Sequence, residues 1–260
     1  MSGIVVIALI ISGLLVGFIN TLAGGGTIIS ISLFMFLGLP AGVANGTNRI
    51  AIILQTLTSS ANFKRQKVLD SRKGLILGIP TVIGSLIGAE IAVDINENIF
   101  KKAIAIIMLV MMVFIVYKPQ QWLNGQQHLV EKKTSFLQYI IFFLIGLYGG
   151  FIHVGVGYFI LAGLVLGSGY DLVKANALKV FIVLLYAPFT LLVFVYNKQI
   201  NYEYGLIHAV GNIIGAYIAS RFAVSWGANF VRWIIIIIIL ITSTQLLGMF
   251  DFKTLFKTFL

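Results

Sequence analysis

Apolar residues occur in runs of about 20 along most of this chain, and short polar stretches separate the runs. In the first half, long runs cover about 3–22, 41–63, 74–93 and 99–117, and a shorter run covers about 27–38. A helix of 20 residues is about 30 Å long, which matches the hydrocarbon core of a bilayer. The pattern therefore predicts membrane helices and not the ten-residue alternation of a membrane β-barrel.

The run at 27–38 is too short to cross a bilayer, because twelve helical residues reach only about 18 Å. Three consecutive glycines, Gly24, Gly25 and Gly26, precede it in an uncharged stretch. Each glycine lowers helix stability by about 1 kcal/mol relative to alanine. Non-helical backbone is tolerated at membrane depth only where it lines a cavity or is buried in protein. We expect a break here, with a new helix N-terminus near Thr27 that suits an anion.

The second half of the chain repeats this order of segments. Long runs cover about 136–153, 172–197, 203–223 and 229–248, and a second short run covers 157–168. Residues at similar offsets match between the halves: Gly13, Gly17, Phe18 and Ile19 with Gly146, Gly150, Phe151 and Ile152; Ala44 and Asn45 with Ala175 and Asn176; Gly84, Gly88, Ala89 and Ala92 with Gly211, Gly215, Ala216 and Ala219. We predict an internal duplication.

The predicted repeats are residues 1–117 and 136–250, joined by a connection at 118–135 in one integrated transport domain. Because each repeat holds five segments, an odd number, the two would lie in the membrane with opposite orientations. The predicted fold is an all-α polytopic membrane protein with two inverted repeats of about five helical segments. Short re-entrant or discontinuous helices are expected near 23–38 and 154–168, a pattern typical of secondary transporters.

Composition and charge strengthen the membrane assignment. The chain is 59% hydrophobic and 10% charged with a mean hydropathy of +1.03, whereas soluble domains carry about 25% charged residues. The net charge of +10 does not indicate a nucleic-acid partner, because Lys and Arg lie in short loops, where they set orientation and contact anionic lipid. The loop at 64–73 has five basic residues and one acid, so we predict that it is cytoplasmic, as is 118–135. The loop at 198–202 and both termini would lie outside.

Arg49 is the first charged residue of the chain and lies about five residues inside an otherwise apolar run. An ionisable residue within a membrane segment is costly and is a functional candidate by default. Asn45, Thr47 and Asn48 add neutral hydrogen-bonding groups beside it. We therefore interpret this stretch as one half of a substrate site.

The matching stretch of the second half contains Asn176 and Lys179, which align with Asn45 and Asn48. Two half-sites, each with a cation and an asparagine, would form a basic pocket at the middle of the membrane. The alternative, which stays open, is that Arg49 and Lys179 extend to the nearest interface.

His153 lies beside the second break, opposite Asn20 of the first half. Histidine can bind a substrate or carry a proton, and a packed, hydrogen-bonded histidine fits the position equally well. The candidate substrate site comprises Asn20, Gly24, Gly25, Gly26, Thr27, Asn45, Thr47, Asn48, Arg49, His153, Gly157, Asn176 and Lys179.

Other features bear on alternatives to a binding site. The glycines spaced four apart at 13, 17, 84 and 88 are predicted to allow close helix packing. We predict no cofactor and no metal, and no catalytic motif such as HExxH or GxSxG occurs. The apolar helix RWIIIIIILI at 232–241 would face lipid or the second copy of a homodimer.

Several stretches resemble the sulfite exporter TauE/SafE family of bacterial membrane transporters: GLLVGFINTLAGGGTIISISLF, GLPAGVANGTNRIAIILQ and the basic KRQKVLD. That family typically pairs a glycine-rich break with an Ala-x-Gly-Thr stretch, here Ala44-Asn45-Gly46-Thr47, twice. The second half departs from the pattern, with GVGYF in place of the glycine triplet and ANALK in place of the Gly-Thr stretch. The resemblance implies transport of sulfite, an organosulfur acid or a related small anion.

We therefore expect a multi-pass secondary transporter of the bacterial cytoplasmic membrane that moves a small anion by alternating access, in contact with membrane lipid. A passive anion channel is an alternative that the sequence leaves open. An intramembrane enzyme is the third alternative.

Overall fold

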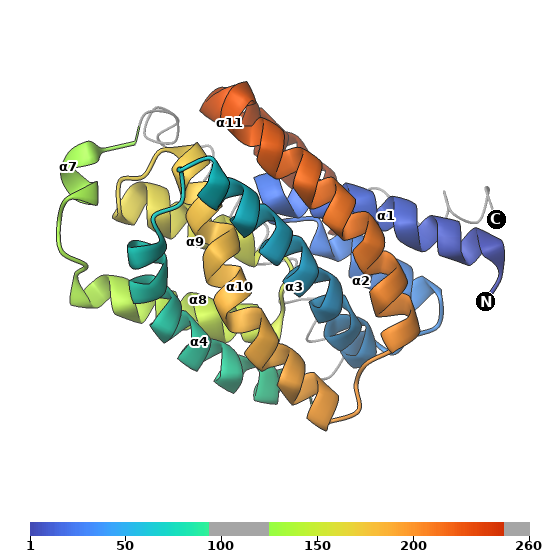
Figure 1. Cartoon of the computed structure of the whole chain (residues 1–260). Coiled ribbons are helices and arrows are strands. Elements are labelled where there is room, and N and C mark those ends of the chain that lie inside the picture. The colour runs from blue at the N-terminus through green and yellow to red at the C-terminus, as the bar shows by residue number, and fades with distance from the viewer. Residues whose placement is uncertain (94–124, 247–260) are drawn as a thin grey trace.

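The computed structural model describes residues 1–93 and 125–246, and every element in these ranges is helical (Figure 1). The all-α class is therefore confirmed. The predicted segment at 99–117, residues 118–124 of the predicted connection and residues 247–250 lie outside the described residues. The elements are α1 (Gly3–Leu22), α2 (Thr27–Phe36), α3 (Ala41–Arg65), α4 (Ser71–Val93), α7 (Gln127–Val130), α8 (Phe136–Phe151), α9 (Val156–Ala162), the π-helix η1 (Gly163–Gly167), α10 (Leu172–Tyr196) and α11 (Tyr202–Leu246).

Four of these helices are long and apolar enough to cross a membrane, namely α1, α4, α10 and the part of α11 up to Gly227. At Gly227 the backbone leaves the helical region, with a φ of 73°, and this bend separates the two runs predicted at 203–223 and 229–248. α3 has 25 residues but carries many polar side chains, most of them buried. α3 packs against α10 and α11, which keep its polar side chains away from lipid.

The predicted break at the glycine triplet is confirmed. α1 ends at Leu22 and α2 begins at Thr27. α2 then runs back along α1. The ring of His208 shows this, since it contacts both the hydroxyl of Ser30 in α2, at 2.8 Å, and the carbonyl oxygen of Leu9 in α1, at 3.0 Å. Residues 3–36 therefore form a re-entrant pair of helices, which we call the first hairpin.

The second short segment forms an equivalent pair. α8 is followed by α9 and η1, and the side-chain amide of Gln138, near the start of α8, donates to the carbonyl oxygen of Gly167 at 2.7 Å. The chain thus returns to the start of α8. Residues 136–167 are the second hairpin.

The tips of the two hairpins touch. Gly24 has a φ of 95°, which L-residues with side chains rarely adopt, and its Cα lies against Gly157. A Cβ added at Gly157 would lie 2.6 Å from the Cα of Gly24, and a Cβ at Gly25 would overlap the hydroxyl of Tyr158. The glycines therefore both break the first helix and let the second hairpin approach it.

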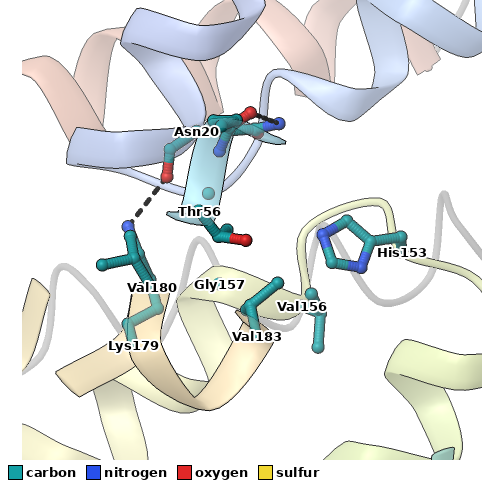
Figure 2. A pocket seen from close by; sticks show the side chains of 10 residues that line it. Asn20, Thr56, His153, Val156, Gly157, Lys179, Val180 and Val183 are labelled. Atoms are coloured by element: carbon teal, nitrogen blue, oxygen red, sulfur yellow. Dashed lines mark hydrogen bonds between the residues drawn. The ribbon is translucent and has the colours of Figure 1, made fainter. Parts of the chain in front are cut away.

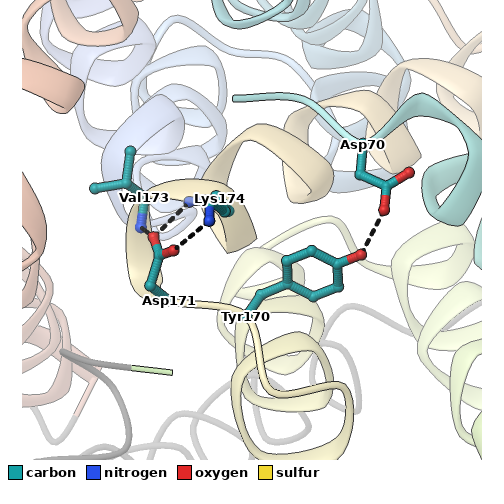
Figure 3. A network of polar contacts seen from close by, with 5 residues as sticks. All are labelled: Asp70, Tyr170, Asp171, Val173 and Lys174. Carbon is teal, nitrogen blue, oxygen red and sulfur yellow. Dashed lines mark hydrogen bonds and ion pairs between the residues drawn. The ribbon is translucent and has the colours of Figure 1, made fainter. Parts of the chain in front are cut away.

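The hairpins enter from opposite ends of the molecule. The first leads into α3, whose Thr47 accepts a hydrogen bond at 2.9 Å from the main chain of Asn201, just before α11. The second leads into α10, and Tyr170, just before that helix, donates to Asp70 between α3 and α4 at 2.6 Å (Figure 3). Burial raises the pKa of the Tyr170 hydroxyl and so does the bond to Asp70, so the hydroxyl remains a donor. The inverted repeat stays a prediction, which this arrangement supports.

Charge divides the two ends as the topology prediction requires. The end that holds Asp70 and Tyr170 carries most of the exposed basic residues among those described: Lys64, Arg65, Lys67, Arg72, Lys132, Lys133 and Lys174. The loop at 197–201, at the other end, contributes Lys198. That the basic end is cytoplasmic stays a prediction, which this distribution supports.

The glycines spaced four apart pack closely against backbone, as predicted. A Cβ at Gly13 would overlap the carbonyl oxygen of His208 in α11, and one at Gly146 would overlap that of Thr81 in α4. Helix pair α1–α11 and helix pair α8–α4 therefore use small residues in the same way.

Cysteines introduced at the two ends test the topology. We expect Ser71→Cys, at the basic end, to react with a membrane-impermeant thiol reagent only after cells are opened, and Tyr202→Cys to react in intact cells. The chain has no cysteine of its own, so the background is clean. Labelling of both positions from the same side would contradict the assignment of the ends.

Alanine substitution tests the packing of α1. Gly13→Ala should lower the melting temperature in detergent, because the methyl group would overlap α11, and overpacking costs about 1–3 kcal/mol. Gly3→Ala is the matched control, since a Cβ there meets nothing within 4 Å. Equal melting temperatures for the two variants would show that the contact is not tight.

Candidate functional site

A small cavity lies where the hairpin tips meet α3 and α10 (Figure 2). The space that the centre of a water molecule can occupy is about 10 Å³, close to the least that holds one water molecule. Residues from both hairpins and both long helices line it: Asn20, Gly24, Gln55, Thr56, His153, Val156, Gly157, Lys179, Val180 and Val183. The lining thus joins the two halves of the chain.

Lys179 brings a buried cation to this cavity. Its side chain is 1% exposed and extends from α10 toward the main chain of Asn20 (Figure 2). The ammonium group donates to the carbonyl oxygens of Asn20 and Thr21 at 2.9 and 3.0 Å, and to the side-chain oxygen of Asn176 at 2.7 Å. These carbonyls belong to the last turn of α1, where a helix has no internal donors for them. Lys179 therefore caps the broken end of α1 while it faces the cavity.

Arg49, from the first half of the chain, caps the end of α8 in the same way. Its guanidinium donates to the carbonyl oxygens of Gly149 and Gly150 at 2.9 and 2.8 Å. It also donates to Thr190 at 3.4 Å and lies 5.4 Å from the ring centroid of Phe194. Arg49 is fully buried, and it does not line the cavity.

The two cations occupy equivalent places at the two helix ends. Asn20 and Thr21 are the third- and second-last residues of α1, and Gly149 and Gly150 are the third- and second-last residues of α8. A cation is favourable there, because the C-terminal end of a helix carries a partial negative charge. Each half of the chain thus supplies the cation that caps the broken helix of the other half.

No buried carboxylate offsets these charges within the described residues. Among the described residues, three basic side chains are buried, namely Arg49, Lys73 and Lys179. Every described Asp and Glu is exposed or partly exposed. Lys73 lies at the basic end, where it donates to Thr134 at 3.0 Å. A buried cation without a carboxylate partner is costly, and it favours an anionic ligand where the ligand can reach it.

The two buried histidines have different surroundings. His153 lines the cavity, and its Nδ1 lies 2.9 Å from the hydroxyl of Tyr186. His208 lies outside the lining, between α1, α2 and α11, with Nδ1 3.0 Å from the carbonyl oxygen of Leu9. Because a carbonyl oxygen only accepts, this nitrogen of His208 carries the proton.

The structure brings together five of the residues that the sequence assigned to the site and places the rest nearby or elsewhere. The five in the cavity lining are Asn20, Gly24, His153, Gly157 and Lys179. Asn176 touches the site through Lys179, and Thr27 touches it through Asn20, whose side-chain amide donates to the Thr27 hydroxyl at 3.2 Å.

The remaining candidates lie outside the lining. Gly25 packs against Tyr158, and a Cβ at Gly26 would lie 3.0 Å from the carbonyl oxygen of Val16. Asn45 donates to the carbonyl oxygen of Phe151 at 3.1 Å, beside Arg49. Thr47 and Asn48 are both fully buried: Thr47 accepts from the main chain of Asn201, just before α11, and the Asn48 amide is buried without a hydrogen-bond partner.

The sequence analysis missed two residues of α3 that follow Arg49 and line the cavity. Gln55 and Thr56 line the cavity, and the amide of Asn20 lies 3.5 Å from the side-chain oxygen of Gln55. Both belong to a stripe of polar residues at helical spacing, which could have revealed them: Asn45, Asn48, Arg49, Gln55, Thr56, Ser59 and Asn62. This stripe is the face that α3 turns away from lipid.

Sequence comparison finds similar membrane proteins along almost the whole chain. The sequence model of the sulfite exporter TauE/SafE family matches residues 9–246. A probable membrane transporter protein of Sinorhizobium, ORF9, is 24% identical over 92% of this chain and 91% of its own length. A probable membrane transporter protein of Haemophilus influenzae is 26% identical, over 92% of this chain and 94% of its own length. The probable membrane transporter protein YfcA of Escherichia coli is 25% identical, over 90% and 86%. No solved structure matches the chain significantly.

The contacts of Arg49 predict a mainly structural effect of its loss. Arg49→Gln should lower the melting temperature in detergent, because the carbonyl groups of Gly149 and Gly150 lose their donors, at about 1–3 kcal/mol for each unpaired group. Arg49→Lys should recover part of the loss, because an ammonium can donate to such carbonyl groups, as that of Lys179 does at the end of α1, but it lacks the planar fork that also reaches Thr190. Arg72→Gln, on the exposed surface of α4, is the control. An unchanged melting temperature for Arg49→Gln would contradict the capping role.

Proposed function

The chain belongs to the sulfite exporter TauE/SafE family of membrane transporters, and from this membership we propose that it carries a small oxyanion, sulfite or an organosulfur acid, across the bacterial cytoplasmic membrane by alternating access. The chain is a multi-pass membrane protein, and its relatives are named as transporters and not as enzymes. The substrate, the mechanism and the particular membrane are the proposal.

One observation carries the choice of an anion. Lys179 is a buried cation on the wall of a cavity, and among the described residues no buried carboxylate accompanies it. An oxyanion would supply the missing charge and accept hydrogen bonds from the ammonium group. Charge-assisted bonds of this kind are about twice as strong as neutral ones. Gln55, Thr56 and His153 add neutral groups around the same space.

The meeting of two hairpins from opposite ends supports alternating access. The first hairpin lies between the cavity and one end of the molecule, and the second lies between the cavity and the other. A cavity of about 10 Å³ is too small for sulfite, so the site has to widen before an anion binds, and separation of the tips would widen it. Separation on one side at a time would expose Lys179 to the two ends alternately. The closed contact of Gly24 with Gly157 favours this over the open pore of a passive channel.

Thermal unfolding in detergent tests the proposed substrate. We expect sulfite and methanesulfonate to raise the melting temperature, because a ligand of the folded state stabilises it by about 2.7 kcal/mol at one hundred times its dissociation constant. Lys179→Gln should lose this shift, and Lys174→Gln should keep it, because Lys174 lies on the same helix with its ammonium group paired to Asp171 at the surface. Chloride at the same concentration controls for ionic strength.

Flux measurements test the transport step itself. Purified protein in liposomes should take up labelled sulfite with saturable kinetics, and sulfite inside the vesicle should accelerate the uptake. Flux that rises linearly with concentration and shows no acceleration would favour a channel. A parent protein that responds to none of the anions, in melting or in flux, would contradict the proposed substrate class.

A further inference from the structure

We propose that the transported anion and the end of α1 compete for the same ammonium protons of Lys179, so that anion binding releases the first hairpin from α10. This inference rests on the proposed function and specifies how its site works. Lys179 would then be both the substrate cation and the latch of the moving hairpin.

The competition follows from the number of donors. A lysine ammonium has three protons, and in this structure all three have acceptors, namely the carbonyls of Asn20 and Thr21 and the side chain of Asn176. An oxyanion that binds Lys179 must therefore displace at least one of them. Asn176 lies on α10, one turn from Lys179, and moves with it. The acceptors to be displaced are the two carbonyl groups of α1.

The exchange is favourable for an anion that reaches the cavity. The carbonyl groups of a helix end carry only part of a negative charge, whereas sulfite or a sulfonate carries at least one full charge. Its charge-assisted hydrogen bonds are the stronger ones. Once the cap is lost, the last turn of α1 is left with unpaired carbonyls and becomes easier to open. Gly24, which touches the second hairpin, lies two residues after Leu22, the last residue of α1.

Because Arg49 differs from Lys179 in its surroundings, an anion would release the end of α1 and not that of α8. Arg49 holds the equivalent carbonyl groups of α8, but its guanidinium does not line the cavity. Thr190 and Phe194 hold it in addition. An anion in the cavity therefore has no access to this cap in the present arrangement, and the end of α8 stays fixed while the end of α1 is released.

Asn176 acts as a positioning residue in this scheme. Its side-chain oxygen accepts from Lys179 at 2.7 Å, and its side-chain nitrogen has no hydrogen-bond partner. Asn176→Asp would therefore lose no hydrogen bond and would place a carboxylate beside the buried ammonium. The substitution should preserve or raise the melting temperature, yet abolish the anion-dependent shift, because Lys179 no longer offers an unpaired charge.

Asn45→Asp is the matched control in the other half. It puts the same carboxylate beside Arg49, 3.5 Å from the guanidinium, away from the cavity lining. It also removes the hydrogen bond from Asn45 to the carbonyl oxygen of Phe151, so it should lower the melting temperature. Its anion-dependent shift should remain. Asn176→Asp is thus expected to keep its stability and lose the anion response, whereas Asn45→Asp should lose stability and keep the response.

Amide hydrogen exchange measures the release directly. The amides of Ala23 and Gly24 both donate to the carbonyl oxygen of Ile19 and report on the end of α1. The amide of Ile152 donates to Tyr148 and reports on the end of α8. We expect sulfite or methanesulfonate to accelerate exchange at Ala23 and Gly24 and to leave Ile152 unchanged, although ligands ordinarily slow exchange. In Asn176→Asp, neither anion should change exchange at any of the three.

The outcomes separate this inference from the proposed function. Anions that raise the melting temperature of the parent protein but slow exchange at Ala23 and Gly24 would overturn the latch and leave the proposed substrate standing. A full anion-dependent shift in Asn176→Asp would overturn the latch as well. A parent protein whose melting temperature and exchange respond to no anion would remove the proposed function, and the latch with it.

Discussion

Carbonyl groups at a helix end inside a membrane have no water to bind, and this fold depends on giving them partners. α1 and α8 both end inside the protein, where the tip of each hairpin meets that of the other. Lys179 and Arg49 supply the missing donors, each from the half of the chain that does not contain the broken helix. The hydrogen bonds that complete each helix therefore also join the two halves. They stabilise both breaks.

The polar stripe of α3 depends on the same enclosure. Contact between lipid and the Asn, Gln, Thr and Ser side chains of this 25-residue helix would be unfavourable. α10 and α11 pack against it instead. Close approach of the outer helices is possible because glycines face backbone at their contacts, as at Gly13 and Gly146. Glycines thus let the helices α1, α11, α4 and α8 pack closely in pairs, while the polar side chains of α3 are buried. The cavity, Gln55 and Thr56 lie in the interior that results.

The halves are alike in architecture and unlike in chemistry. Each has a re-entrant hairpin, a cation on the following long helix and an asparagine beside that cation. The lysine faces the cavity, whereas the arginine is enclosed by carbonyl, hydroxyl and aromatic groups. In the scheme we propose, this difference assigns substrate binding and movement to one half and a fixed frame to the other. Two halves of similar architecture can thus have different roles without any change in helix arrangement.

The sequence by itself determined the helical segments that the structure describes, with the short ones near 27–38 and 157–168, the glycine break before Thr27 and the basic end. These features depend on local composition and spacing, which a single segment contains. It singled out Arg49 and Lys179 but left open whether they are buried in a pocket or extend to the interface, and both are buried. Only the tertiary structure decided that Lys179 lines the cavity and Arg49 does not, and that Gln55 and Thr56 join the lining. The reason is that the partners of these side chains lie far along the chain: 100 and 101 residues separate Arg49 from the carbonyls it caps, and 159 and 158 separate Lys179 from those of α1. The depth and direction of a cation in the membrane follow from such distant contacts, which no local pattern encodes.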